Sequence, residues 1–170
     1  MKPIQHNTSP NITFPDNLTH LVSPGELVQW TLEAVQTLFW SNRPDGPTPV
    51  VAGAFNPRIL LTLLTYSYAT GVFNSAEISG QCQQEAVSRY LSMGIRYAPD
   101  RIRLFRGQNA QLLKRTLAFV IRRVYEHAFL SANTPATWSL PVSQQDAHWR
   151  FQQALQADNA NCNDARCAAS

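Results

Sequence analysis

The sequence predicts an all-α fold, a helical bundle with a helix-turn-helix-like module, for three reasons. Apolar residues recur at helical spacing over long stretches, as in the seam Val28, Leu32, Val35 and Phe39. Prolines and glycines stand where helices would begin and end, and no run of residues alternates apolar and polar side chains as a half-buried strand does. With 170 residues, 44% of them hydrophobic, the chain can form one domain with a core.

The first half of the chain predicts an arm followed by two helices. Prolines interrupt residues 1–24, which we expect to form an irregular N-terminal arm. A helix should follow Pro24 and end before the turn-rich segment 41–49. The next should begin at Pro57 and end at a Gly71 cap. Because that helix is apolar on nearly all sides, we expect it to be the buried central helix.

Three short helices are expected next, over roughly residues 75–83, over roughly 85–93 and from Pro99 onward. Asn74 is placed to cap the first of them, and Gly94 is expected to close the second. Short helices joined by glycine-containing turns are the ingredients of a helix-turn-helix module. This pattern is the basis of that part of the fold prediction.

A longer helix is expected from Gln108 to about Leu130, with the apolar seam Leu113, Leu117, Val120 and Val124. The helical domain is therefore expected over residues 25–132. Residues 133–170 are expected to form a polar, largely disordered tail, with at most a short helix around Ala147–Leu155. Four aromatic residues in apolar helical contexts are expected in the core: Tyr66, Tyr68, Phe73 and Tyr90.

Positive charge is concentrated in one segment of the chain. Residues 89–123 contain nine basic side chains and one acid, Asp100, so this segment carries +8, whereas the other 135 residues sum to −5. Eight of the nine are arginines, which suit bidentate contacts to phosphates or guanine edges. A solvated helix face usually carries charges of both signs, so the imbalance favours a polyanion, namely double-stranded DNA, over that simpler alternative.

The basic segment also suggests which residues would contact DNA. If the helix from Pro99 is a recognition helix, Arg101 and Arg103 are placed to reach base edges, while the basic residues of the following helix would contact phosphates. Arg106 lies at the edge of the apolar seam, so a DNA contact and a buried structural role both stay open. The predicted DNA-binding set is Arg96, Arg101, Arg103, Arg106, Gln108, Asn109, Lys114, Arg115 and Arg122.

Other classes of site find little support. The three cysteines are an odd number in a sequence without a secretory signal, which argues against a disulfide framework. No apolar stretch is long enough to span a bilayer, so we expect a cytoplasmic protein without a membrane partner. Cys162 and Cys167 have only His148 nearby, and no phosphate loop or catalytic motif occurs. We therefore expect no metal, no cofactor and no catalysis by this chain alone.

The segment PRILLTLLTYSYATGVFNSAEISGQCQQEAVSRYLSMGIRYAPDRIRLFRGQN resembles the N-terminal domain of InsH-like bacterial insertion-sequence transposases. That family joins an apolar helix to Ser-Ser-Arg-x-Ile-Glu, an aromatic-Leu pair, a Pro-Asp turn and Phe-Arg-x-x-Asn/His. The matching residues are Gly71, Ser75, Ile78, Tyr90, Leu91, Pro99, Asp100, Ile102, Phe105, Arg106 and Asn109. LVSPGELVQWTLEAVQTL is similar to the family's opening helix, so the resemblance covers roughly residues 18–130.

The resemblance implies a DNA-binding domain that recognises element-end sequences in transposition. Catalysis would belong to an Asp-Asp-Glu domain, which is not among these residues, so a separate catalytic transposase subunit is an expected partner and a homodimer stays open. Two alternatives remain. One is a stand-alone helix-turn-helix regulator that binds a palindromic operator as a dimer. The other is a truncated relic or protein-interaction domain, which the replacement of the family's Ser-Ser-Arg arginine by Ala76 favours.

Overall fold

The computed structural model describes residues 14–41, 56–130 and 139–167, which form seven α-helices, one short 3-10 helix and no strand. The all-α prediction is therefore confirmed. In chain order the elements are η1 (Leu18–His20), α1 (Pro24–Ser41), α2 (Pro57–Ala69), α3 (Ser75–Gln84), α4 (Ala86–Leu91), α5 (Pro99–Gln108), α6 (Ala110–Leu130) and α7 (Ser139–Cys167).

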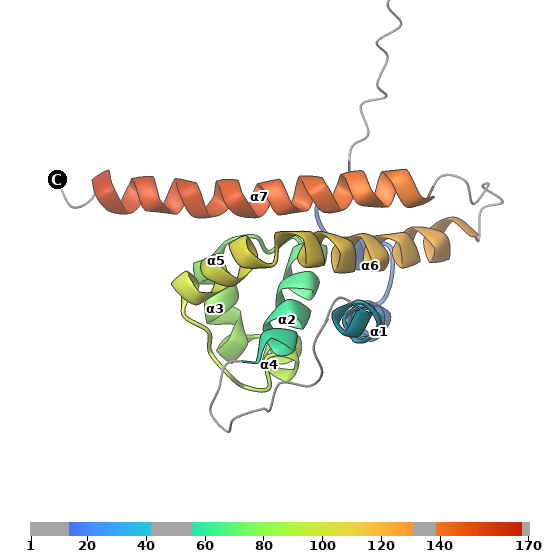
Figure 1. The fold of residues 1–170 in the computed structure, drawn as a ribbon, viewed down its shortest axis with the longest axis horizontal. Coiled ribbons are helices and arrows are strands. Elements are labelled where there is room, and N and C mark those ends of the chain that lie inside the picture. Colours follow the sequence, from blue (N-terminus) through green and yellow to red (C-terminus); the bar gives the residue numbers. More distant parts are fainter. Residues whose placement is uncertain (1–13, 42–55, 131–138, 168–170) are drawn as a thin grey trace, which may run out of the picture.

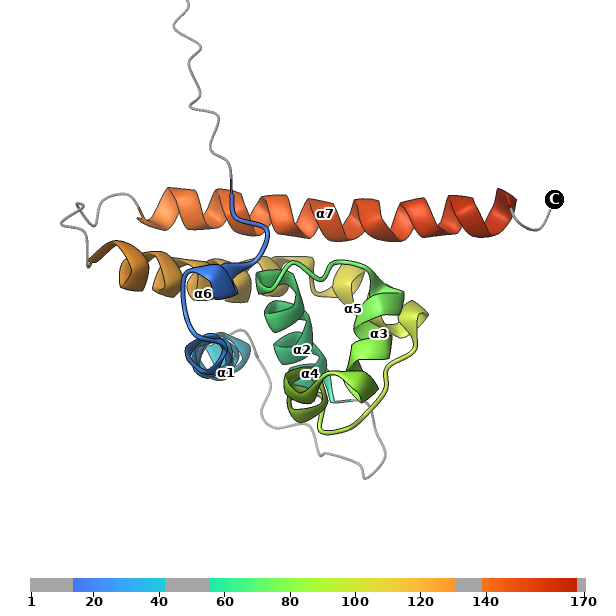
Figure 2. The same cartoon turned by 180° about the vertical axis from the view of Figure 1, so that it is seen from behind.

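The helices pack around α2. Helices α6 and α7 lie side by side and antiparallel, and α1 crosses α6 (Figures 1 and 2). Helix α5 leads into the start of α6 and packs on α3, while α4 lies beside the end of α2 that is farthest from α7. All ten residues Leu60–Ala69 of α2 are buried, which confirms the predicted central helix. The predicted seam of α6 is also fully buried: Leu113, Leu117, Val120 and Val124. Each such side chain contributes about 1.5–3 kcal/mol through removal from water.

The ends of α2 follow the predicted signals. Asn56 caps its start by accepting a hydrogen bond from the Arg58 N–H at 3.0 Å. At its other end Gly71 has φ +83°, and the Val72 N–H donates to the carbonyl two positions inside the helix end, at Ser67. A Cβ atom on Gly71 would lie 2.8 Å from the Asp16 carbonyl oxygen. Glycine is therefore required both by the backbone conformation and by the close approach of the arm.

The inward face of α1 differs from the predicted seam. Leu27, Thr31, Ala34 and Val35 are buried, whereas Leu32 is 38% exposed and Val28 is half-buried. The apolar residues of this helix follow helical spacing on two neighbouring faces, and the face with the small residues Thr31 and Ala34 is the one that packs inward. The Thr31 hydroxyl donates to the Leu27 carbonyl at 2.8 Å, so its burial leaves no unpaired polar group. The side chain of Phe39 lies outside the described residues.

Helix α4 ends at Leu91, two residues before the predicted end, and the left-handed conformation after it is adopted by Met93 as well as by the predicted cap Gly94, whose φ is +72°. The Gly94 N–H donates to the Arg89 carbonyl at 2.8 Å and the Met93 N–H to the Tyr90 carbonyl at 3.1 Å, which places Met93 at the left-handed position, with φ +55°. A non-glycine residue in this conformation costs about 1–2 kcal/mol. Tyr90, predicted to be in the core, is 68% exposed, so that prediction is wrong. Tyr66 and Tyr68 are buried, as predicted.

The predicted disordered tail is instead largely a 29-residue helix, α7, packed along α6 (Figure 1). Its inward face repeats every three or four residues: Ser143, Asp146, Ala147, Arg150, Phe151, Ala154 and Asp158. The predicted boundary at residue 132 is therefore not the end of the packed body. The described part of the arm is packed as well, since Leu18 is fully buried.

Arg150 is fully buried and fastens α7 to α2 and to the arm. Its Nε donates to Asp146 Oδ1 at 2.8 Å, its Nη1 donates to the Tyr68 and Asp16 carbonyls at 2.8 Å each, and its Nη2 donates to the Pro15 carbonyl. The Tyr68 carbonyl belongs to the last turn of α2, where carbonyls have no partner within the helix and a cation is favourable.

Asp146 completes this buried cluster. The Tyr125 hydroxyl of α6 donates to Asp146 Oδ2 at 2.7 Å. Burial raises the pKa of the Asp146 carboxyl, although Arg150 and the hydrogen bond from Tyr125 oppose that rise. Burial also raises the pKa of Tyr125, which therefore stays a hydrogen-bond donor. A buried charge is tolerated when it is paired and hydrogen-bonded, and this cluster meets both conditions.

Arg150→Met should lower the free energy of unfolding. The substitution keeps the apolar stem of the side chain but leaves the Asp146 carboxylate and the carbonyls without their donor, which costs about 3–5 kcal/mol. Urea denaturation followed by circular dichroism should show that loss in the free energy of unfolding. Arg89→Met, at an exposed position of α4, is the control and should change it by no more than about 0.5 kcal/mol. Equal effects of the two substitutions would contradict the role given to Arg150.

Candidate nucleic-acid interface

The predicted DNA-binding residues separate into three groups in the structure. Arg96 precedes α5, and Arg101 and Arg103 lie on α5 itself. Arg106 is buried. The other five surround two adjoining hollows along α6: Gln108, Asn109, Lys114, Arg115 and Arg122.

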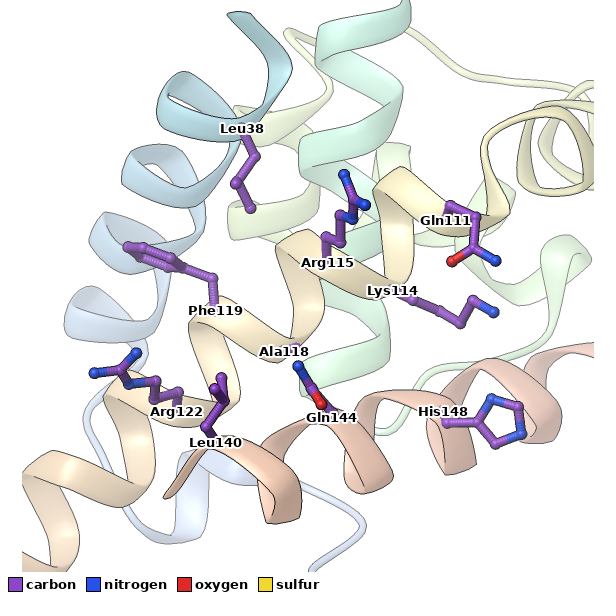
Figure 3. Close-up of a pocket in the computed structure, with 10 residues that line it drawn as sticks. All are labelled: Leu38, Gln111, Lys114, Arg115, Ala118, Phe119, Arg122, Leu140, Gln144 and His148. Carbon is purple, nitrogen blue, oxygen red and sulfur yellow. The ribbon is translucent and has the colours of Figure 1, made fainter. Parts of the chain in front are cut away.

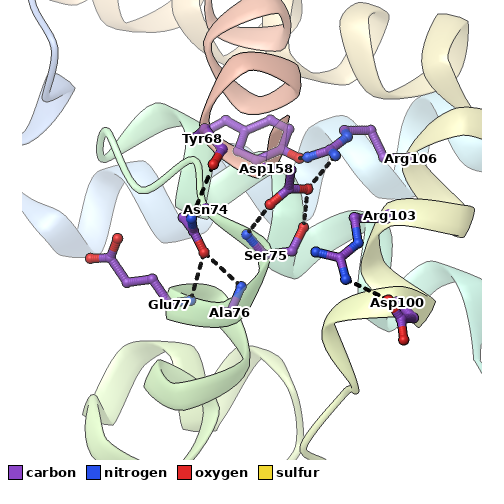
Figure 4. A network of polar contacts seen from close by, with 10 residues as sticks. Tyr68, Asn74, Ser75, Ala76, Glu77, Asp100, Arg103, Arg106 and Asp158 are labelled. Carbon is purple, nitrogen blue, oxygen red and sulfur yellow. Dashed lines mark hydrogen bonds and ion pairs between the residues drawn. The ribbon is translucent and has the colours of Figure 1, made fainter. Parts of the chain in front are cut away.

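Of the two roles left open for Arg106, a DNA contact and a buried structural role, the structure shows the buried one, so Arg106 leaves the DNA-binding set. It is 3% exposed, it forms an ion pair with Asp158 of α7, and its Nη1 donates to the Tyr68 hydroxyl at 3.2 Å (Figure 4). Asp158 also accepts hydrogen bonds from Ser75 of α3, from the backbone N–H at 2.8 Å and from the hydroxyl at 2.6 Å. The network joins four helices, and a side chain buried in it and held by α2 and α7 cannot reach a nucleic acid.

The charges of this buried network favour the ion pair. Burial acts to raise the pKa of Asp158, but hydrogen bonds from Ser75 and Arg106 outweigh it and hold that pKa below its ordinary value. Burial likewise acts to lower the pKa of Arg106, but Tyr68 and Asp158 raise it. Burial raises the pKa of Tyr68 to about 12. At neutral pH the network therefore contains a charged pair and a neutral phenol, with the carboxylate at the positive end of α3.

The cations on and before α5 are partly engaged in contacts within the protein. Arg103 pairs with Asp100 one turn earlier (Figure 4). Arg96 is exposed, and its Nε donates to the Ser79 hydroxyl at 3.4 Å. Arg101 is exposed on α5. An exposed ion pair is worth at most about 1 kcal/mol, so Arg103 could exchange Asp100 for a phosphate at little cost.

A groove of about 480 Å³ runs along α6, between the end of α1 and the first turns of α7. Lys114, Arg115 and Arg122 extend into its surroundings from α6, and His148 from α7 (Figure 3). Lys114 and Arg122 are eight residues apart, slightly more than two helical turns, which brings them to the same side of the helix. None of the described residues that line the groove is acidic.

The floor and edges of this groove are apolar, with Leu38 from α1, Ala118 and Phe119 from α6, and Leu140 from α7. Two of the cations have neighbours of their own. The Lys114 ammonium lies 5.4 Å from the centre of the Phe151 ring, and the Arg122 Nε donates to Glu126 at 2.6 Å. The Arg122 side chain is nevertheless 49% exposed. The groove is thus a cationic site with an apolar floor.

A second hollow of about 420 Å³ lies at the junction of α5 and α6, where Gln108, Asn109 and Gln111 contribute amide groups. The helical path is nearly continuous here, because the Asn109 N–H donates to the Phe105 carbonyl at 2.9 Å and the Leu113 N–H to the Asn109 carbonyl at 2.9 Å. Both hollows include Gln111 and Arg115, so they form one surface. We define the α6 surface as Gln108, Asn109, Gln111, Lys114, Arg115, Phe119 and Arg122.

Sequence reasoning missed what the neighbouring helices add to this surface. Gln144 and His148 of α7 line the groove, but they fall in the segment predicted to be disordered. Their spacing of four residues is the signal that could have placed both on one helical face. The connections between α3, α4 and α5 differ from those of a helix-turn-helix module. Only Glu85 separates α3 from α4, whereas residues 92–98 separate α4 from α5. That connection is longer than the usual turn of three or four residues.

Neither a metal cluster nor a membrane span is found in the part of the chain that the structure describes. There, no group of three or more potential metal ligands comes together. No helix in the same ranges is both long and apolar enough to cross a bilayer. Cys82 is buried, and burial raises the pKa of its thiol. A thiol in that condition is a poor nucleophile.

Asp158→Asn should remove a pH-dependent part of the stability. Because the pKa of Asp158 is lowered in the folded state, its contribution is present above about pH 4 and is lost as the pH falls through the folded-state value. The variant should be less stable than the wild type by about 3–5 kcal/mol at pH 7, and the difference should shrink toward pH 2. Urea denaturation at several pH values measures it.

Asp100→Asn is the matched control for this measurement, because Asp100 pairs with an arginine at the surface. Its effect should stay below about 1 kcal/mol at every pH. A difference between wild type and Asp158→Asn that is as large at pH 2.5 as at pH 7 would show that ionisation of Asp158 does not stabilise the fold.

The comparisons with known proteins add no family to this geometry. The chain matches no protein-family model, and no curated protein and no solved structure is significantly similar to it.

Proposed function

We propose that the chain is a DNA-binding domain that acts in DNA transposition, is non-catalytic by itself and contacts double-stranded DNA through the α6 surface. The observation that carries the proposal is the groove lined by Lys114, Arg115 and Arg122 and by no acidic residue among those described. Cations gathered in a groove raise the local potential and attract phosphates.

The adjoining hollow supplies the second half of the proposed interface. Phosphate contacts by the groove cations would fix the position of the duplex but carry no sequence information. Glutamine and asparagine amides can pair with both hydrogen-bonding groups of an adenine edge in the major groove. Gln108, Asn109 and Gln111 are therefore the proposed readers of sequence, and Arg101 of α5 would extend the contact.

The assignment to transposition depends on the resemblance to InsH-like N-terminal domains. Several matched residues have structural roles in this fold: Ile102, Phe105 and Arg106 form the buried face of α5, and Ser75 binds Asp158 at the start of α3. In this proposal α3, α4 and α5 are a helix-turn-helix-like support, and element-end sequences are the target. A stand-alone regulator would instead protect a palindromic operator as a dimer.

Lys114→Gln/Arg122→Gln should weaken DNA binding and its dependence on salt. Each phosphate contact contributes about 0.9 to the slope of log K against log salt, so the variant should lose about 2 from that slope. Fluorescence anisotropy with element-end duplexes between 50 and 200 mM salt measures affinity and slope. For specific ends we expect a wild-type Kd of about 10⁻⁸–10⁻¹¹ M.

Arg58→Gln/Arg89→Gln is the control, because it removes the same charge from elsewhere in the fold. Arg58 lies in the first turn of α2, opposite the end held by Arg150, and Arg89 lies on α4, on the far side of the fold from α7 (Figure 1). This variant should retain the wild-type slope. Wild-type affinity no tighter than micromolar, or equal losses in the two double variants, would refute the proposal.

A second candidate function is contact with another protein, and one exposed cluster favours it. Tyr90, Met93 and Ile95 follow one another around the end of α4 and are 68%, 73% and 45% exposed. The left-handed conformation of Met93 is unfavourable, and its exposed side chain makes no buried contact within the chain that would offset this cost. A catalytic transposase subunit or a second copy of the chain are the partners that the resemblance suggests for this cluster.

Met93→Gly should raise the free energy of unfolding by up to about 1 kcal/mol, because glycine adopts a positive φ without strain. Ile95→Gly, an exposed neighbour whose φ is not positive, is the control and should lower it. Thermal and urea denaturation measure both. If Met93→Gly destabilises the protein as Ile95→Gly does, the backbone at this position is not strained, and that result would contradict the proposal that the cluster contacts another protein.

A further inference from the structure

The groove along α6 has more apolar surface than contact with paired DNA requires. In a duplex the bases are stacked inside, and the backbone that reaches a protein surface is sugar and phosphate. Phosphates would satisfy Lys114 and Arg122, but the apolar floor between them would face no matching group. Leu140, at the edge of the groove, is 51% exposed in spite of its size.

The order of side chains along α6 alternates charge with apolar surface. Lys114, Ala118 and Arg122 follow at intervals of four residues, so a cation lies one turn before the apolar floor and another lies one turn after it. Over these eight residues the helix rises about 12 Å. A nucleic acid strand alternates in the same way, with a phosphate on each side of every base.

One aromatic ring is available to a base in this groove. Phe119 is half-buried and lines the groove together with Leu38 (Figure 3). The Arg123 guanidinium lies 5.6 Å from the centre of the Phe119 ring and is held by Glu33 of α1 at 2.7 Å, which limits the freedom of the ring. Ala118 has only a methyl group at the centre of the floor and leaves space beside it. The volume of about 480 Å³ lies in the range of sites for small organic ligands.

We infer that the groove accepts an unpaired nucleotide, with its base against Phe119 and Leu38 and the flanking phosphates on Lys114 and Arg122. The inference rests on the proposed DNA-binding function and narrows its substrate to DNA that is unpaired at one or more positions. Stacking of a base on an aromatic side chain tolerates any base, because every base has a π face. The domain would then distinguish opened from fully paired DNA at this site, independently of sequence.

The test compares three fluorescent DNA probes of equal length: a duplex, the same duplex with an unpaired thymine, and a dT single strand. Wild-type protein should bind the probes with unpaired thymine about five- to 100-fold more tightly than the duplex. Phe119→Ala should abolish that preference, whereas Phe119→Trp should preserve it. A 2-aminopurine at the unpaired position should change its fluorescence on binding only where the aromatic ring is present.

A second variant keeps the test decisive even if Phe119→Ala is unstable. Ala118→Leu fills the floor of the groove without removing a side chain, and it should lower the affinity for the unpaired probes to that for the duplex. Equal wild-type affinity for duplex and unpaired probes would overturn this inference while the proposed function stands. Binding of no probe, at any salt concentration, would overturn both.

Discussion

The guanidinium of Arg150 is the interaction on which most of this architecture depends. It is fully buried on a helix whose inward face holds few large apolar residues, and it binds a carboxylate together with carbonyls of α2 and of the arm. Removing a charge from water is unfavourable by several kcal/mol unless every donor finds an acceptor. The contact with Asp146 lies within α7, whereas the contacts with the carbonyls join α7 to α2 and to the arm. The contacts that satisfy the buried guanidinium therefore also fix how α7 packs on α2 and on the arm.

The shape of the candidate interface depends on how α7 is attached to the rest of the fold. Helix α7 forms one side of the groove, through Leu140, Gln144 and His148, and its inward face carries both buried ion pairs. Asp158 holds Arg106 on the inner side of α5, while Lys114 and Arg122 lie along the groove of α6, where Lys114 is half-buried and Arg122 is exposed. The fold thus buries Arg106 and Arg150 in ion pairs and leaves its other described basic residues partly or fully exposed. Only these exposed residues are available to a phosphate.

Sequence reasoning succeeded where apolar periodicity agrees with the residues that start and end helices, as in α2 between Pro57 and Gly71, and in the seam of α6. It failed for α7, because an inward stripe of Asp146, Arg150 and Asp158 has the hydropathy of a solvated tail, and partners up to 135 residues away make it a core. The groove cations could be predicted from local charge. The burial of Arg106 could not, since its acid lies 52 residues further along the chain. Local pattern determines helices, and distant pairing determines which face turns inward.

The wide separation along the chain of the partners of α7 has a consequence for how the molecule is made. Its anchors reach Ser75 across 83 residues and the arm across 134 or more, so they can form only after the rest of the domain has been synthesised and has collapsed. Until then the Arg106 guanidinium and the carbonyls at the end of α2 must form hydrogen bonds with water or with other groups of the chain. A fragment that ends before Asp158 lacks the partner of both Arg106 and Ser75, so it should be less stable than the full chain.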